Sequence, residues 1–170
     1  LGNGDGVLIT GSANRIGLPS VGLAQANGFY GNAVGVQILH PGGGNLVRGN
    51  RFGGPGLANV AAVGVSGSSG NTISENEIGQ NFAGVSVAEA NAPTIAAVDN
   101  AILANRIWAN TQYDLRLGFG APHDDGQVGF IPDADEGPNH LQNPPHITSA
   151  SLSQGSTTIT GNIDAAPGRY

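Results

Sequence analysis

The stretch Asn71-Thr-Ile-Ser-Glu-Asn76-Glu-Ile-Gly-Gln-Asn81 decides the fold, because its pattern recurs along the chain. The hexapeptide Asn-x-[Ile/Phe]-x-x-[mostly Asn] begins at four places: Asn27, Asn50, Asn76 and Asn105. The second copy runs from Asn50 to Pro55, so proline stands there in place of the last asparagine. An Asn-x-[Ile/Val] tripeptide lies five residues before three of the hexapeptides, at Asn45, Asn71 and Asn100. Asn14-Arg-Ile16 fits as its first copy, with an insertion around Leu18–Gln25 before Asn27.

A second repeat consists of Gly-Val followed by alternating apolar residues. It occurs at Gly6-Val7, Gly35-Val36, Gly64-Val65 and Gly84-Val85, and Tyr113–Leu117 keeps the alternation without glycine. If Val7, Val36, Val65, Val85 and Leu115 are equivalent, the spacings are 29, 29, 20 and 30 residues. Such lengths suit one turn of a solenoid.

Each repeat unit is typical of a short strand with one buried face, because apolar residues alternate with small or polar ones. The units are too short and too often interrupted by glycine and asparagine for helices. One coil cannot bury its inner face alone, so coils must stack with equivalent residues about 4.8 Å apart. Three inward columns are expected: Val7, Val36, Val65 and Val85; Ile16, Val47, Ile73 and Ile102; and Phe29, Phe52, Ile78 and Ile107.

The repeated asparagines are expected at the corners between strands. Asparagine tolerates the left-handed backbone conformation of a sharp bend, and its amide can bond the coils on both sides. A stacked row of amides forms a ladder like those of cross-β structures. We therefore interpret these asparagines as stacking residues and not as ligand-binding residues.

The composition fits such a fold and excludes several partners. Charged residues make up 11% of the chain, against about 25% in typical domains, and the apolar content of 39% argues against disorder. With no lysine, six scattered arginines and a net charge of −6, we expect no nucleic-acid partner. No apolar run reaches about 18 residues, so we expect no membrane span. The absence of cysteine excludes disulfides and thiolate metal sites.

From Gly6 to Gly118 the repeats resemble the right-handed parallel β-helix proteins of the pectate-lyase-like superfold. The resemblance implies an all-β, right-handed parallel β-helix of about five coils over residues 1–118. Lyases of this superfold hold Ca²⁺ with several acids beside an Arg or Lys base, and its hydrolases use clustered aspartates with a Gly-His-Gly run. This chain has no lysine, no Gly-His-Gly and no two acids at equivalent positions of adjacent coils, as a glycosidase pair would need.

The run Asp133-Ala-Asp135-Glu-Gly137-Pro-Asn139-His-Leu141-Gln-Asn143-Pro resembles a segment of large secreted bacterial surface proteins, where it leads from a β-helix into a β-sandwich module. The resemblance implies a capping and linking segment at 119–145 and the truncated start of a β-sandwich-like module at 146–170. Ile147 to Ser153 and Ser156 to Asp164 are expected as two strands joined by Gln154-Gly155. Because two strands cannot make a stable sandwich, we expect the chain to belong to a larger chain or assembly.

The acidic segment after the coils is the best candidate for a site. Asp133, Asp135 and Asn139 offer oxygen ligands at the alternate spacing of calcium loops, with Gly137 permitting the turn. The alternative is a cap of Asx turns that closes the open end of the helix through side chain–backbone hydrogen bonds. Both interpretations stay open at this point, and no other cofactor is predicted.

These features predict a non-catalytic structural or adhesive β-helix module of a secreted or cell-surface bacterial protein, with no catalytic residue assigned. The alternative is a carbohydrate-active β-helix, a polysaccharide lyase or glycoside hydrolase, or a carbohydrate-binding one, whose site is incomplete in this sequence. The expected partners are polysaccharide or other protein chains. We interpret Trp108, Tyr113 and Phe119 as a cover for the core of the last coil, with a sugar-stacking platform as the alternative.

Overall fold

The computed structural model describes residues 3–17, 26–90, 95–118 and 146–162. These residues form strands and turns and no helix. The described ranges therefore include no helix with the length and apolar character needed to cross a bilayer.

The described residues between 3 and 108 form four successive coils of three strands each. The first coil contains β1 (Asn3–Ile9), β2 (Arg15–Ile16) and β3 (Gly28–Phe29), and the second contains β4 (Asn32–Leu39), β5 (Leu46–Arg48) and β6 (Arg51–Phe52). The third contains β7 (Ala61–Ser66), β8 (Thr72–Ser74) and β9 (Glu77–Gly79). The fourth contains β10 (Ala83–Ala88), β11 (Ala101–Leu103) and β12 (Arg106–Trp108), and β13 (Tyr113–Leu117) begins another turn.

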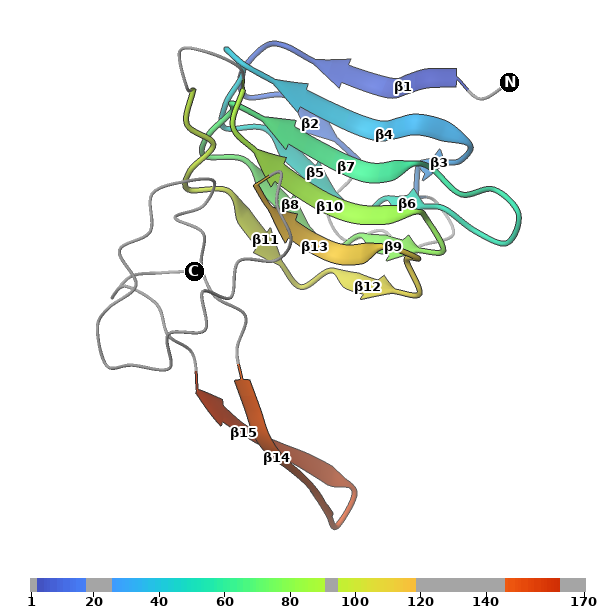
Figure 1. Ribbon diagram of the computed structural model, residues 1–170, viewed down its shortest axis with the longest axis vertical. Coiled ribbons are helices and arrows are strands. Elements are labelled where there is room, and N and C mark those ends of the chain that lie inside the picture. Colours follow the sequence, from blue (N-terminus) through green and yellow to red (C-terminus); the bar gives the residue numbers. More distant parts are fainter. Residues whose placement is uncertain (1–2, 18–25, 91–94, 119–145, 163–170) are drawn as a thin grey trace.

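Equivalent strands of successive coils pair in parallel and form three sheets. Figure 1 shows the strands of the first sheet side by side, in order from β1 to β13. The first sheet has the order β1-β4-β7-β10-β13, the second β11-β8-β5-β2, and the third β12-β9-β6-β3. The predicted parallel β-helix is confirmed. It has about four turns and not five, because only the first sheet has a fifth strand.

Two of the three predicted core columns are confirmed. The isoleucine and valine column lies in register across the second sheet, and the phenylalanine and isoleucine column across the third. Val47, Phe52, Ile73 and Ile78 have no exposed surface. The rings of Phe29 and Phe52 stack with centroids 4.9 Å apart and planes 13° apart, a separation that matches the spacing of neighbouring strands.

The predicted valine column is wrong in one member. Val63, and not Val65, lies between Val36 and Val85 in the register of the first sheet. Val65 occupies the next inward position of its strand. Residues two apart on a strand share a face, so the alternation of apolar residues alone does not choose between the two valines.

A small residue precedes each valine because the backbone of the next coil lies close by. A side chain at Gly35 would approach the backbone oxygen of Ala62, and one at Gly84 would approach that of Asp114. Ala62 itself fills this position in the third coil. The Gly64-Val65 dipeptide therefore matches the repeat in residue type only. It lies two residues after the position that is equivalent to Gly35-Val36 in the strand register.

The strands β14 (His146–Ser153) and β15 (Ser156–Asn162) form an antiparallel hairpin, as predicted for this segment. Gln154 and Gly155 connect them with φ angles of 47° and 78°. Two successive positive φ angles are characteristic of a type I′ turn, whose twist suits a hairpin. Paired positions place Ala150, Leu152 and Ile159 on one face of the hairpin.

Candidate functional site

The residues predicted to form a calcium site lie outside the described part of the chain. Asp133, Asp135 and Asn139 all fall within 119–145, so the choice between a calcium loop and an Asx-turn cap stays a prediction. Among the residues that the structure describes, no group of three or more His, Cys, Asp or Glu side chains could hold a metal ion.

The predicted asparagine stacking is confirmed and forms three ladders along the corners of the coils. In each ladder, an asparagine donates a hydrogen bond to the side-chain oxygen of the asparagine in the next coil, at 2.7–3.1 Å. The members are Asn14, Asn45, Asn71 and Asn100; Asn27, Asn50, Asn76 and Asn105; and Asn32, Asn59, Asn81 and Asn110.

Asn76 shows how completely an inner ladder amide is used. Its side-chain oxygen accepts bonds from the backbone N–H and the Nδ2 of Asn50, at 2.9 and 3.1 Å. Its own Nδ2 donates to the backbone oxygen of Val47 and to Oδ1 of Asn105, both at 2.9 Å. A carboxamide has two donor protons and two acceptor lone pairs, so this side chain has no capacity left for a ligand.

The expectation that the asparagines take the left-handed conformation is wrong, because at ten of the twelve ladder positions the preceding residue makes the bend. No ladder asparagine is among the described residues with positive φ. Ten residues that directly precede a ladder asparagine have φ between 51° and 69°: Ala13, Gly31, Gly44, Gly49, Gly70, Glu75, Gln80, Asp99, Ala104 and Ala109. Six of these are not glycine, although the left-handed conformation costs a residue with a Cβ about 1–2 kcal/mol.

Ala104→Gly is expected to raise the free energy of unfolding by about 0.5–1 kcal/mol, because glycine adopts the φ of 52° found there without strain. Ala101→Gly, in β11 of the same coil, is the matched control and should lower it by a similar amount. Denaturant titration of both variants measures the two changes. Equal destabilisation by both substitutions would contradict the strain at position 104.

Asn59 was not predicted as a ladder residue, because Pro55 stands at the hexapeptide position where the other copies have an asparagine. Asn59 is buried and donates from Nδ2 to Oδ1 of Asn81 at 2.8 Å. A signal was present: Asn59 lies four residues before Val63, and Asn81 lies four residues before Val85. The extra residues between β6 and β7 move the corner asparagine away from the hexapeptide and leave this offset unchanged.

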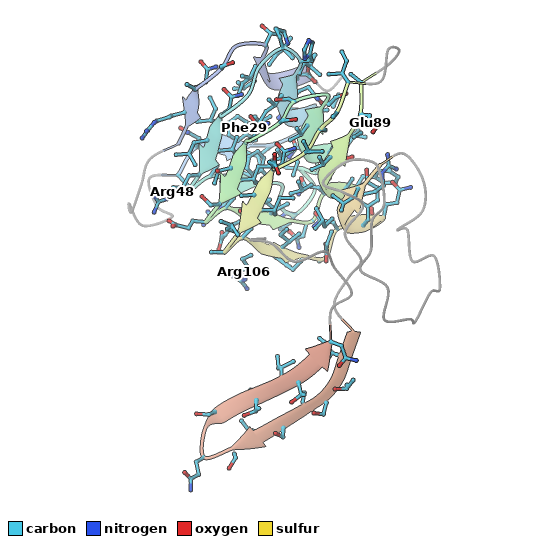
Figure 2. All side chains as sticks on the ribbon, turned by 90° about the vertical axis from the view of Figure 1, so that its left-hand side faces the viewer. Phe29, Arg48, Glu89 and Arg106 are labelled. Carbon is cyan, nitrogen blue, oxygen red and sulfur yellow. The ribbon has the colours of Figure 1, made fainter. Side chains whose placement is uncertain are left out.

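The outer charged face consists of Arg48, Arg51, Glu75, Glu77 and Arg106, on the second to fourth coils. Arg48 binds Glu75 with two hydrogen bonds, of 2.9 and 2.7 Å. Glu77 lies between two arginines, 3.0 Å from Nε of Arg51 and 3.5 Å from Nη1 of Arg106. Figure 2 shows Arg48 and Arg106 projecting outward from the coils.

These ion pairs connect neighbouring coils from the outside. The register places Arg51, Glu77 and Arg106 in one row across the third sheet, which explains their alternating charge. Exposed ion pairs contribute about 0.2–1 kcal/mol each, so the row adds little to the stability of the core. The neighbours of Glu77 in this row are arginines and not carboxylates, unlike the acid pair of a glycoside hydrolase.

Trp108 was predicted to cover the core of the last coil, and this prediction is wrong. Trp108 follows the inward Ile107 on β12, so its side chain leaves the opposite face of the strand. Its ring lies back over Gly79 of the preceding coil, in the space that a side chain at Gly79 would fill. The guanidinium carbon of Arg106 lies 4.6 Å from the ring centroid, within the range of a cation–π interaction.

Comparison of the chain with protein-family models, with curated proteins and with solved structures finds no match in any of the three. The parallel β-solenoid and its asparagine ladders are therefore assigned from the strand register and the side-chain hydrogen bonds alone.

Proposed function

We propose that this chain is a non-catalytic structural or adhesive module of a secreted or cell-surface bacterial protein. One observation carries the proposal: the polar side chains of the coils bind mainly to other coils. The amide of Asn76 is fully engaged between Asn50 and Asn105, and the carboxylates of Glu75 and Glu77 pair with arginines. Side chains that are engaged in this way hold neighbouring coils together and are not available to act on a substrate.

Secretion and bacterial origin rest on the similarity of the run from Asp133 to Asn143 to segments of large secreted bacterial surface proteins. A β-sandwich-like module after this run is supported by the hairpin of β14 and β15. Its apolar residues Leu152 and Ile159 are 76% and 63% exposed, which suits a face that packs on further strands. Calcium binding by Asp133, Asp135 and Asn139 stays a prediction.

An oligosaccharide array followed by analysis of the bound and released sugars tests the proposal. We expect no glycan to be shortened, even after long incubation, because the carboxylates of the outer charged face are held by arginines. Adhesion to a glycan or a protein without cleavage is compatible with the proposal. Cleavage of any glycan on the array would overturn it.

A second candidate function is carbohydrate binding at the outer charged face. The observation in its favour is that Trp108 presents an aromatic ring beside Arg106, with Glu77 in the adjacent coil. Sugar sites combine apolar and aromatic surfaces with a few placed polar groups. The test compares glycan retention by two variants, Trp108→Ala and Phe82→Ala, the second at an exposed phenylalanine. Loss of retention in Trp108→Ala, with retention unchanged in Phe82→Ala, would favour this candidate.

A further inference from the structure

Asn27 differs from the other ladder asparagines in the residue that follows it. Gly28 follows Asn27, whereas each of the other ladder asparagines is followed by a residue with a side chain. The backbone nitrogen after an asparagine can attack the carbonyl carbon of the asparagine side chain, and a Cβ on the attacking residue hinders that approach. Glycine has no Cβ and allows the backbone to come close to another group. Asn27 is therefore the ladder residue at which this attack is least hindered.

The side chain of Asn27 can turn more easily than that of an inner ladder residue. Asn27 is exposed, and within the described ranges its side chain makes one hydrogen bond, from Nδ2 to Oδ1 of Asn50 at 3.0 Å. Asn76 is buried, and its side chain takes part in four hydrogen bonds. Rotation of the amide toward the backbone therefore breaks one hydrogen bond at Asn27 and four at Asn76.

The corner at Asn27 also lacks the bend of the inner corners. Gly49, Glu75 and Ala104 precede the other three members of this ladder and have φ angles of 68°, 54° and 52°. Ala26 precedes Asn27 and has no positive φ. The backbone at Asn27 is therefore not fixed in the conformation that the inner corners share.

The backbone N–H of Gly28 lies on the outer edge of its strand. β3 is the end strand of the third sheet. Across its inner edge, β6 and the residue after it donate to the backbone oxygens of Asn27 and Phe29. Because the backbone groups of successive residues point to opposite edges of a strand, the N–H of Gly28 points away from β6. The pairing with β6 therefore does not engage the nitrogen that would attack.

We propose that Asn27 is a site of spontaneous deamidation in the folded chain. The backbone nitrogen of Gly28 forms a bond to Cγ of Asn27, and the bond from Cγ to Nδ2 breaks. Nδ2 leaves as ammonia, which carries away the proton of the attacking nitrogen. Water then opens the five-membered imide ring at either carbonyl and leaves aspartate or isoaspartate at position 27. Water is the only co-reactant, and no group is oxidised or reduced.

The reaction adds a negative charge at the exposed end of one ladder and leaves the inner coils in place. An aspartate at position 27 can no longer donate to Oδ1 of Asn50, but water can donate there because this end of the ladder is exposed. The hydrogen bonds from Asn50 to Asn76 do not involve position 27. We therefore expect the aspartate product to stay folded, with a stability close to that of Asn27→Ala.

Peptide mapping of the folded 170-residue chain after incubation in a mildly alkaline buffer tests this proposal. Cleavage after arginine gives a peptide from Ile16 to Arg48, in which tandem mass spectrometry separates Asn27 from Asn32 and Asn45. We expect conversion at Asn27 to be at least about tenfold faster than at Asn32, which corresponds to a barrier lower by about 1.4 kcal/mol. No conversion at Asn27, or equal rates at Asn27 and Asn32, would overturn the proposal.

Gly28→Ala tests whether the reaction runs through the Gly28 nitrogen. The added Cβ would meet the ring of Tyr30, which is 39% exposed and can move aside. We expect conversion at Asn27 to slow by at least about tenfold. Gly4→Ala is the matched control, because position 4 has open space and belongs to the other Asn-Gly pair of the chain. It should leave the rate at Asn27 unchanged.

Circular dichroism confirms that both variants are folded, and the unchanged chain decides the matter even if one is not. An unchanged rate at Asn27 in folded Gly28→Ala, or an equal slowing in folded Gly4→Ala, would also overturn the proposal.

Discussion

Asn76→Ala is expected to lower the free energy of unfolding by about 3–5 kcal/mol. The substitution removes the acceptor of the backbone N–H and of one Nδ2 proton of Asn50, a residue with no exposed surface. It also removes the donor to the backbone oxygen of Val47. Each buried polar group left without a partner costs about 1–3 kcal/mol. Chemical denaturation followed by circular dichroism gives the change.

Asn27→Ala is the matched control, because it removes an asparagine from the exposed end of the same ladder. Asn27 makes one side-chain bond, to Oδ1 of Asn50 at 3.0 Å, and water can replace it there. The expected loss is about 1 kcal/mol or less. An equal loss in the free energy of unfolding for both substitutions would mean that the hydrogen bonds of the inner amides do not stabilise the coils more than those at the exposed end.

Phe52→Ala is expected to destabilise the chain by about 3–5 kcal/mol, the range typical of a buried phenylalanine. Phe52 has no exposed surface, and its ring stacks on Phe29 and lies against the space above Gly35. The interior of the solenoid is one side chain deep from each sheet, so no second layer can collapse into the cavity. Thermal and denaturant unfolding measure the effect.

Phe82→Ala controls for the loss of a phenyl ring as such. Phe82 is 48% exposed and lies in the turn before β10, outside the core cluster. We expect its removal to cost well under half as much as the removal of Phe52. A larger loss at Phe82 than at Phe52 would mean that the inward columns are assigned to the wrong faces.

The fold was predictable because its strongest constraints are local and repeated. Ile73 and Ile78 lie at fixed distances after Asn71 and Asn76, and these short offsets do not change from coil to coil. Two complete core columns follow from them. The corner between the third and first sheets was harder, because the extra residues before Asn59 break the spacing between the hexapeptide and the next strand.

One overlooked offset explains both errors at that corner. Asn32, Asn59 and Asn81 each lie four residues before the correct valine of the first sheet. Choosing Val65 makes that offset six residues in the third coil and leaves Asn59 without a role. The position of the bend was not predictable from residue preference, since Glu75 and Ala104 adopt a conformation that their side chains disfavour.

The candidate site was less predictable than the fold, because it depends on which side chains meet across coils. Only the register reveals that Arg51 and Arg106 flank Glu77 and leave 15% of its side chain exposed. Trp108 likewise lies over a glycine of the preceding coil, a contact that no spacing within its own coil indicates.

Stacked asparagines fix the register of the coils, and nuclear Overhauser contacts of the Asn76 side-chain amide measure this stacking in solution. We predict contacts to Asn50 and Asn105, which are 26 and 29 residues away in sequence. We also predict that these amide protons exchange with solvent far more slowly than those of Asn27. Contacts confined to sequence neighbours, with exchange as fast as at Asn27, would contradict stacking of the asparagines across coils.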